Sequence, residues 1–207
     1  MRLYLASTSP ARLATLRAAG VEPIVLASEV DEDAAVAAAA GRTTADLVQL
    51  LARLKAEAVA NRAGCQSIDG FILGADSAFE LDGVGYGKPL TAAIARERWL
   101  LQRGRTGRLH TGHWLIDHRT GVAHGSRGAV STAAVVFADN ITDEEIDAYV
   151  ATGEPLQVAG AFTIDSLGAP FITSIVGDPH TVVGLSLATL RRLFLEFGVS
   201  WPLLWNR

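Results

Sequence analysis

The chain contains very little cysteine and has no surplus of positive charge. Cys65 is the single cysteine among 207 residues, which excludes a disulfide framework and a thiolate-rich zinc site. We therefore expect a reducing, cytoplasmic setting, with Cys65 as a small packing residue and not a nucleophile. The formal net charge of -4 argues against binding to a DNA or RNA polymer, which normally needs a basic surface.

Long apolar runs and several well-known site motifs are also missing. No stretch of about 18 apolar residues occurs, and the apolar start of the chain is too short for a signal peptide, so no membrane contact is expected. The five histidines show no HExxH spacing, and GxSxG, Walker and GxGxxG patterns do not occur. The composition, with 49% hydrophobic and 19% charged residues, is that of an ordinary globular protein.

Strand and helix signals alternate along the chain, which predicts a mixed α/β fold. Strands are expected at residues 2–6, 21–26, 71–75, 109–117, 130–137 and 171–176. Helices are expected from Ser9 as N-cap to Gly20, and over residues 34–40, 44–62, 91–102, 142–150 and 183–197. Turns are expected at Asp82-Gly83 and at residues 119–121. Such a chain forms one domain over residues 1–207, which can consist of two small lobes sharing a core.

Lys55 is the most informative single residue. In the helix expected over residues 44–62, it falls about 40° from Leu51, inside the apolar stripe and not opposite it. The other members of that stripe are Leu47, Leu50, Leu54 and Ala58. An ammonium on the core side of a helix needs an anion, although a lysine that extends from the edge of the stripe into water gives the same pattern.

Two carboxylate positions could supply the anion. Asp76 follows the apolar run 71–75, and a carboxylate at the end of such a strand faces the crevice where α/β proteins bind ligands. It could serve there as a general base or a metal ligand, or simply cap a turn. Glu32 lies in EVDED, and such a cluster of oxygens suits Mg²⁺ or Mn²⁺, although a solvated acidic loop has the same composition.

Further cations complete a pattern that suits phosphate groups. Lys88 follows a flexible glycine loop in GYGKP, and Ser7, Ser9 and Arg12 surround a helix start, where anions bind. An ordinary turn and plain helix capping would explain the same residues one at a time. Taken together, these cations and carboxylates fit a phosphoanhydride held with a divalent metal.

Eight segments in this order resemble the Maf family of nucleotide pyrophosphatases, also called septum formation inhibitor proteins. They are LASTSPAR, SEVDED, LARLKAEA, LGADS, GYGKP, EIDAYV, VAGAF and VVGLSL, and they cover nearly the whole chain. The resemblance implies a Maf/ITPase-like fold, in which helices flank an elongated mixed sheet and one active-site cleft lies between two lobes. It also implies a homodimer, as in many members.

The resemblance further implies an enzyme that uses Mg²⁺ or Mn²⁺ to hydrolyse nucleoside triphosphates to monophosphates and pyrophosphate, removing non-standard or surplus nucleotides. Asp76 and Glu32 would be the catalytic residues: Asp76 would accept the proton of the attacking water, and Glu32 would be a partner of the metal or of the water. Both carboxylates would hold the metal. The triphosphate would be held by Ser7, Arg12, Lys55 and Lys88. An alternative is a cell-division regulator that acts through protein contacts, and a third is a nucleotide-binding protein with other phosphoryl chemistry.

Three positions depart from the residues common in the family. They are Ala11, where Arg or Trp is frequent, Ser77, where Thr or Gln is frequent, and Asp165, where Gln or Glu is frequent. By resemblance, these positions separate a branch that prefers dTTP and UTP from one that prefers 7-methyl-GTP, CTP and UTP. The sequence matches neither set, so the preferred base stays open and we expect altered or relaxed selectivity.

Overall fold

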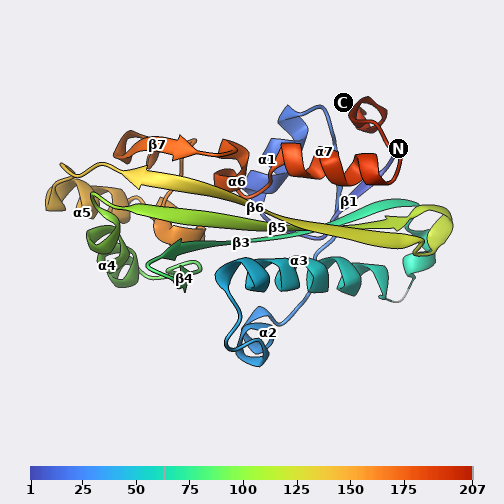
Figure 1. Cartoon of the computed structure of the whole chain (residues 1–207), viewed down its shortest axis with the longest axis horizontal. Helices are drawn as coiled ribbons and strands as arrows, with labels where there is room; N and C mark the ends of the chain where they lie inside the picture. The colour runs from blue at the N-terminus through green and yellow to red at the C-terminus, as the bar shows by residue number, and fades with distance from the viewer. Residues whose placement is uncertain (63, 207) are drawn as a thin grey trace.

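A long mixed sheet forms the middle of the molecule (Figure 1). The computed structural model describes residues 1–62 and 64–206, and the sheet within them has seven strands in the order β2-β1-β3-β5-β6-β7, with β4 paired to β3. β1 pairs in parallel with β2 and β3, whereas the other pairings are antiparallel. The strands are β1 (Leu3–Leu5), β2 (Ile24–Val25), β3 (Gly70–Leu81), β4 (Val84–Tyr86), β5 (Thr106–His118), β6 (Gly125–Phe137) and β7 (Ile172–Val176).

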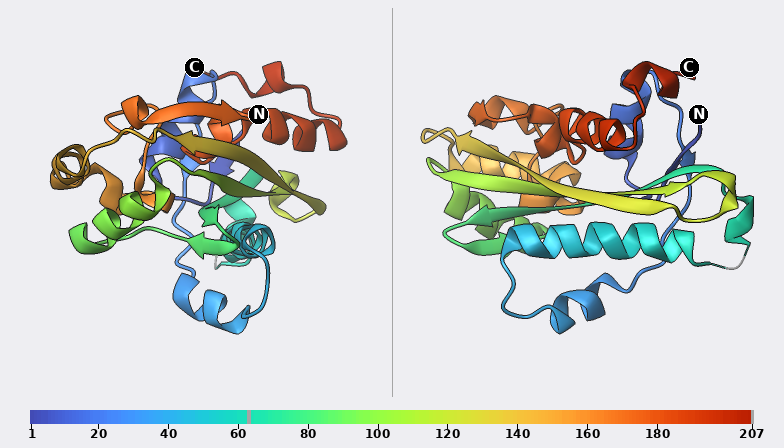
Figure 2. Two further views of the ribbon diagram at one scale, coloured as in Figure 1. Left: turned by 60° about the vertical axis from the view of Figure 1, so that its left-hand side comes forward. Right: turned by 45° about the vertical axis from the view of Figure 1, so that its right-hand side comes forward.

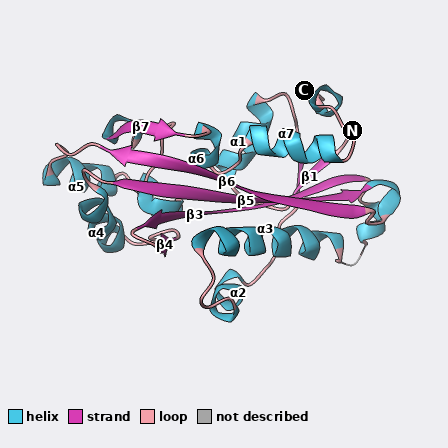
Figure 3. Ribbon diagram, in the orientation of Figure 1, coloured by secondary structure: helices cyan, strands magenta, loops and turns pink. Residues whose placement is uncertain are grey.

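Helices cover both faces of this sheet, which confirms the expected mixed α/β class (Figures 2 and 3). On one face lies α3 (Thr44–Ala60), with α2 (Glu32–Ala38) beyond it. The other face carries α1 (Pro10–Ala18), α6 (Pro179–Val183) and α7 (Leu187–Glu196). At one end of the long strands, α4 (Ala92–Gln102) packs against α5 (Asp143–Ala151).

Local chemistry explains where several elements begin. The side chain of Ser9 accepts from the backbone N–H of Arg12 at the start of α1, as expected for an N-cap followed by proline. Thr142 and Glu145 form the predicted capping box of α5. Asp82 and Gly83 both have left-handed φ angles, 53° and 77°, and form the expected tight turn between β3 and β4.

β3 is longer than the sequence pattern predicted, and this corrects the place of Asp76. The predicted strand ended at residue 75, but Asp76 pairs with Gly112 of β5 and the ladder continues to Glu80 opposite Arg108. Antiparallel pairing to β5 satisfies the backbone along this polar stretch, so the strand does not stop where the apolar run stops. Asp76 therefore lies inside a strand, and the expectation that it ends one was wrong.

The single C-terminal helix expected over residues 183–197 was also wrong. Gly184 adopts φ 110° and ends α6, and Ser186 then caps α7 by accepting from the backbone N–H of Thr189. Glycine adopts such positive φ angles readily and is frequent just after a helix end. The break turns the carbonyl of Gly184 toward the side chain of Arg12.

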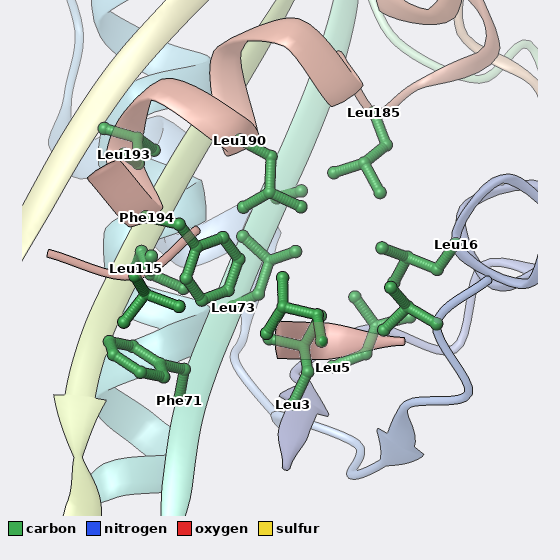
Figure 4. Close-up of a cluster of buried hydrophobic side chains, with 14 residues drawn as sticks. Leu3, Leu5, Leu16, Phe71, Leu73, Leu115, Leu185, Leu190, Leu193 and Phe194 are labelled. Atoms are coloured by element: carbon green, nitrogen blue, oxygen red, sulfur yellow. The ribbon is translucent and has the colours of Figure 1, made fainter. Parts of the chain in front are cut away.

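One edge of β3 is left open between two hydrophobic cores. β1 pairs with Phe71–Leu73 and β4 pairs with Phe79–Leu81, so residues 74–78 have no strand partner on that side within the described chain. The first core joins β1, β3, α1 and α7 and includes Leu5, Leu16, Leu73, Leu190 and Phe194 (Figure 4). The second joins β3, β5, β6, α4 and α5 and includes Phe79, Trp99, Phe137 and Tyr149.

Candidate functional site

The open edge of β3 carries a compact group of charges. The ammonium of Lys55 on α3 lies 2.6 Å from Oδ1 of Asp76 and 2.9 Å from Oε1 of Glu32, at the start of α2. The side chains of Lys55 and Asp76 are only 8% and 13% exposed, whereas that of Glu32 is 51% exposed. The prediction that Lys55 needs an anion is thus confirmed. A lysine that only extends into water is excluded, because the ammonium is buried and paired.

Close contact between α3 and the sheet places Lys55 over Asp76. A Cβ atom at Gly74 would lie 2.0 Å from the carbonyl oxygen of Ala52, and one at Gly112 would lie 2.4 Å from that of Val48. Only glycine at both positions lets the helix backbone come so near the strands. As a result the buried face of α3 is rotated from the predicted stripe, of which only Leu51 is buried; that face comprises Thr44, Val48, Leu51, Ala52, Lys55, Ala56, Val59 and Ala60.

Burial and nearby cations act on Asp76 in opposite directions. Burial raises the pKa of this carboxyl above its ordinary value, and the charges of Lys55 and Arg12 only partly counter that effect. An ionised Asp76 therefore depends on its two cationic neighbours. A carboxylate in this state has a stronger affinity for a proton than an exposed one, which suits a general base.

Arg12 ties the end of β1 to β3 and α6. Its Nε donates to the carbonyl of Gly184 at 2.8 Å, and its two terminal nitrogens donate to Oγ of Ser7 and Oγ of Ser77, both at 3.1 Å. Burial lowers the pKa of Arg12, and the charges of Asp76 and Glu32 counter that shift. The structure thus brings Ser7, Arg12 and Ser77 together beside the carboxylates.

A chain of hydroxyl groups beyond Ser77 was not predicted from the sequence. Oγ of Ser77 lies 2.8 Å from Oγ1 of Thr111, which donates to the carbonyl of Thr181, whose hydroxyl lies 2.6 Å from Oγ of Ser131. Thr111 is fully buried. The available signal was a threonine inside a long strand, where a buried hydroxyl must find a partner.

Three other predicted residues, Lys88, Asp165 and Ala11, lie apart from this cluster. Lys88 is exposed in the loop after β4 and makes no ion pair within residues 1–62 and 64–206. Asp165 is exposed and, with Ala11, lines a groove of about 370 Å³ beside α1. Ser77 is not among the residues lining that groove, so the three positions linked to base choice do not form one contact set.

Asp76 and Glu32 could hold a divalent metal together with a phosphate ligand. Their oxygens converge on the same ammonium, but no group of three histidine, cysteine, aspartate or glutamate side chains suited to a metal occurs among the described residues. Mg²⁺ is commonly held by one or two carboxylates, with water and substrate phosphates filling its other positions. The donor set therefore fits a metal that arrives with a nucleotide.

Sequence comparison gives a consistent result along the chain. The family model described as Maf-like protein matches residues 2–197. A nucleoside triphosphate pyrophosphatase of Leifsonia xyli subsp. xyli is 65% identical over all of this chain and 98% of its own length. Proteins of the same name from Salinispora tropica and Corynebacterium diphtheriae are 51% and 47% identical over the whole chain, covering 88% and 99% of their own lengths.

Solved structures show only a distant likeness. The Ham1 protein of Staphylococcus aureus matches 96% of this chain and 100% of its own, with 15% identity and a TM-score of 0.49. A HAM1 protein from Coxiella burnetii gives the same identity and TM-score over 95% of this chain and 99% of its own. None of the helices in the described part of the chain is long and apolar enough to cross a membrane.

Proposed function

The chain belongs to the Maf family of nucleoside triphosphate pyrophosphatases, and we propose that it hydrolyses nucleoside triphosphates between the α and β phosphates. The products would be a nucleoside monophosphate and pyrophosphate. The observation that carries this proposal is the buried ammonium of Lys55, which lies within 3 Å of carboxylate oxygens from both Asp76 and Glu32. Such a group can both bind a polyphosphate and prepare water for attack.

Asp76 is proposed as the general base. The oxygen of a water molecule would form a bond to the α phosphorus as the bond from that phosphorus to the bridging oxygen breaks. Asp76 would take the proton of the water, and pyrophosphate would leave. The raised pKa of this buried carboxyl favours proton transfer to it, while Lys55 keeps it ionised before the reaction.

The other site residues are proposed to bind and orient the triphosphate. Arg12, Lys55 and Ser7 would contact phosphate oxygens, and Lys88 would close on the polyphosphate from the loop after β4. A divalent metal held by Glu32 and Asp76 would neutralise phosphate charge and polarise the bond to be broken. In this proposal one domain forms a single cleft between two lobes, at the open edge of β3. A homodimer stays a prediction.

The test is hydrolysis of a panel of nucleoside triphosphates with Mg²⁺ or Mn²⁺, followed by separation of the products. Wild-type protein is expected to give monophosphate and pyrophosphate, and Asp76→Asn to be slower by at least about 100-fold because it lacks the base. Asp139→Asn, which alters an exposed carboxylate, is the matched control. Orthophosphate with diphosphate as products, or full activity of a folded Asp76→Asn variant, would contradict the proposal.

A further inference from the structure

A groove beside α1 has the size and polarity of a small-molecule site. Its volume of about 370 Å³ lies within the range of roughly 300–1,000 Å³ that is common for ligand pockets. Most of its wall is made of short apolar side chains, which leave room for a flat ring. The lining residues are Ala11, Ala14, Thr15, Ala18, Ala19, Asp165, His180, Val183 and Leu187.

Two side chains supply the free polar groups of this groove. The hydroxyl of Thr15 already donates to the carbonyl of Ala11 within α1 at 2.9 Å. Asp165 and His180 are both exposed, and they are the two lining residues whose side chains can carry a charge. Recognition of a polar ligand here would therefore depend on these two residues.

Asp178 fixes the chemical role of the His180 ring. Nδ1 of His180 lies 3.1 Å from Oδ1 of Asp178, which is also bound by the backbone N–H of His180 and, through its other oxygen, by the hydroxyl of Ser186. Burial raises the pKa of Asp178, but these hydrogen bonds outweigh that effect and hold the pKa below its ordinary value, so the ionised carboxylate only accepts. In neutral His180, Nδ1 then carries the proton and Nε2 is an acceptor. No partner for Nε2 occurs among the residues that the structure describes.

Glu154 fixes the loop that carries Asp165. Its carboxylate accepts hydrogen bonds from the hydroxyls of Tyr149, Thr163 and Ser166, and from the backbone N–H groups of two further residues, Leu167 and Gly168. Donors on both sides of Asp165 are thus bound to one carboxylate. Asp165 is therefore a second acceptor held in place at the groove, because its loop is fastened and its own carboxylate is left to the ligand.

The groove is joined directly to the proposed phosphate site. Ala11 precedes Arg12 in the chain, and the side chain of Arg12 donates to the carbonyl of Gly184, the residue that ends the helix bearing His180. The backbone N–H of Gly184 in turn donates to the carbonyl of His180. A nucleotide whose phosphates contact Arg12 could thus place its base in the groove.

We propose that His180 is a base-selecting residue, whose Nε2 accepts a hydrogen bond from an exocyclic amino group of the nucleobase beside Asp165. This inference rests on the proposed hydrolysis of nucleoside triphosphates. A groove that offers two acceptors favours bases whose edge offers N–H donors, since a base with a carbonyl there would leave acceptors facing each other. The expected preferred class is therefore the triphosphates whose base carries an exocyclic amino group, which are those of guanine, cytosine and adenine, over those of uracil, thymine and hypoxanthine.

A thermodynamic cycle tests the contact by combining a substitution at His180 with a change in the substrate. GTP and ITP are compared because inosine differs from guanosine only by the missing amino group. At pH 8.5, wild-type kcat/KM is expected to favour GTP by about tenfold, the effect of one hydrogen bond in a site built for it. His180→Asn retains a donor near the Nδ1 position but lacks Nε2, and it should reduce this ratio at least about fivefold. His180→Gln places an amide near the position of Nε2 and should restore part of the preference for GTP over ITP.

His124→Asn is the matched control, because His124 is exposed in the distant turn between β5 and β6. An unchanged GTP-to-ITP ratio in His180→Asn would overturn the proposal, and so would an equal loss in the control. CTP and UTP are measured in the same way as a second pair.

Binding of the same nucleotides by calorimetry separates this inference from the proposed reaction. If wild-type protein binds GTP more tightly than ITP and His180→Asn does not, the base contact stands even without turnover. If hydrolysis occurs but His180→Asn changes neither the GTP-to-ITP ratio of kcat/KM nor that of the binding affinities, the reaction stands and the role of His180 is refuted.

Discussion

Gly74 and Asp76 lie two residues apart on the same face of β3, and the absence of a side chain at the first determines what the second can contact. Because Cβ at Gly74 would lie 2.0 Å from the carbonyl oxygen of Ala52, α3 can approach only a glycine. This approach brings Lys55 to 2.6 Å from Asp76.

We expect Gly74→Ala to destabilise the protein by about 1–3 kcal/mol, since a well-packed interior must shift to admit the methyl group. Thermal unfolding measures this loss, which corresponds to a fall in Tm of roughly 2–12 °C for a chain of this length. Activity should fall as well, because α3 carries Lys55. Gly87→Ala is the control, since a Cβ there has no atom within 4 Å. Equal Tm values for the two variants would refute the packing argument.

Removing the ammonium of Lys55 should shift the pH dependence of hydrolysis. Lys55→Met leaves Asp76 buried without its nearest cation, so the pKa of that carboxyl rises further and the acid limb of kcat/KM moves to higher pH. We also expect kcat/KM at pH 8 to fall by about 100-fold or more, as for loss of a phosphate-binding cation.

Arg53→Met on the same helix is the control for Lys55→Met, because Arg53 forms an exposed ion pair with Glu57. Such surface pairs contribute about 0–1 kcal/mol, so stability and the pH profile should both stay close to wild type. An unchanged acid limb in Lys55→Met would show that Asp76 is not the titrating base.

His113 should make the protein less stable as the pH falls from about 6.5 to about 4. Burial lowers the pKa of His113 to about 4, while Nε2 accepts a hydrogen bond from the backbone N–H of Ser186. In the unfolded chain the imidazole of His113 has a pKa near 6.5, so it is protonated there at a higher pH than in the folded protein. The stability that neutral His113 contributes above pH 6.5 is therefore lost as the pH falls toward 4. His113→Gln keeps an acceptor but does not titrate. Denaturant unfolding between pH 4 and 7 should therefore show a shallower loss for this variant than for wild type.

Glu154 should stabilise the protein through the loop that it fastens. Burial raises the pKa of Glu154, but hydrogen bonds from Ser166, Thr163 and Tyr149 outweigh that effect and lower it to about 2. The folded pKa lies below the unfolded one, so this stability is present above about pH 4.3 and is lost as the pH falls toward 2. Glu154→Gln should cost about 1–3 kcal/mol at pH 7, and the difference from wild type should narrow at pH 3. A difference that is constant with pH would contradict the role of the charge.

Local chemistry made much of the fold predictable. Caps such as Ser9 and Thr142, and the turn at Asp82-Gly83, depend on neighbouring residues, and the structure has them where the sequence placed them. The limits of β3 and the break at Gly184 depend instead on contacts with distant parts of the chain. Pairing with β5 extends β3 past its apolar run, and the pattern of residues 71–75 contains no information about that partner.

The candidate site was predictable to a similar extent. Helical periodicity placed Lys55 among apolar residues, and that placement required an anion, which the structure supplies in Asp76 and Glu32. The hydroxyl chain through Thr111 was missed because it joins residues 70 positions apart, and no local pattern encodes such a distance. The same holds for the groove, which both Asp165 and Ala11 line although they are remote in the sequence.

The open edge of β3 also bears on how the molecule avoids self-association. Unpaired strand edges attract strands from other molecules and can start aggregation. Here the unpaired stretch is bounded on either side by β1 and β4, its residues are buried or half-buried, and Lys55 lies against Asp76. A second strand would find only the short stretch between residues 74 and 78, none of which is exposed. The arrangement that leaves this edge unpaired at the proposed phosphate site therefore also makes it a poor template for fibril growth.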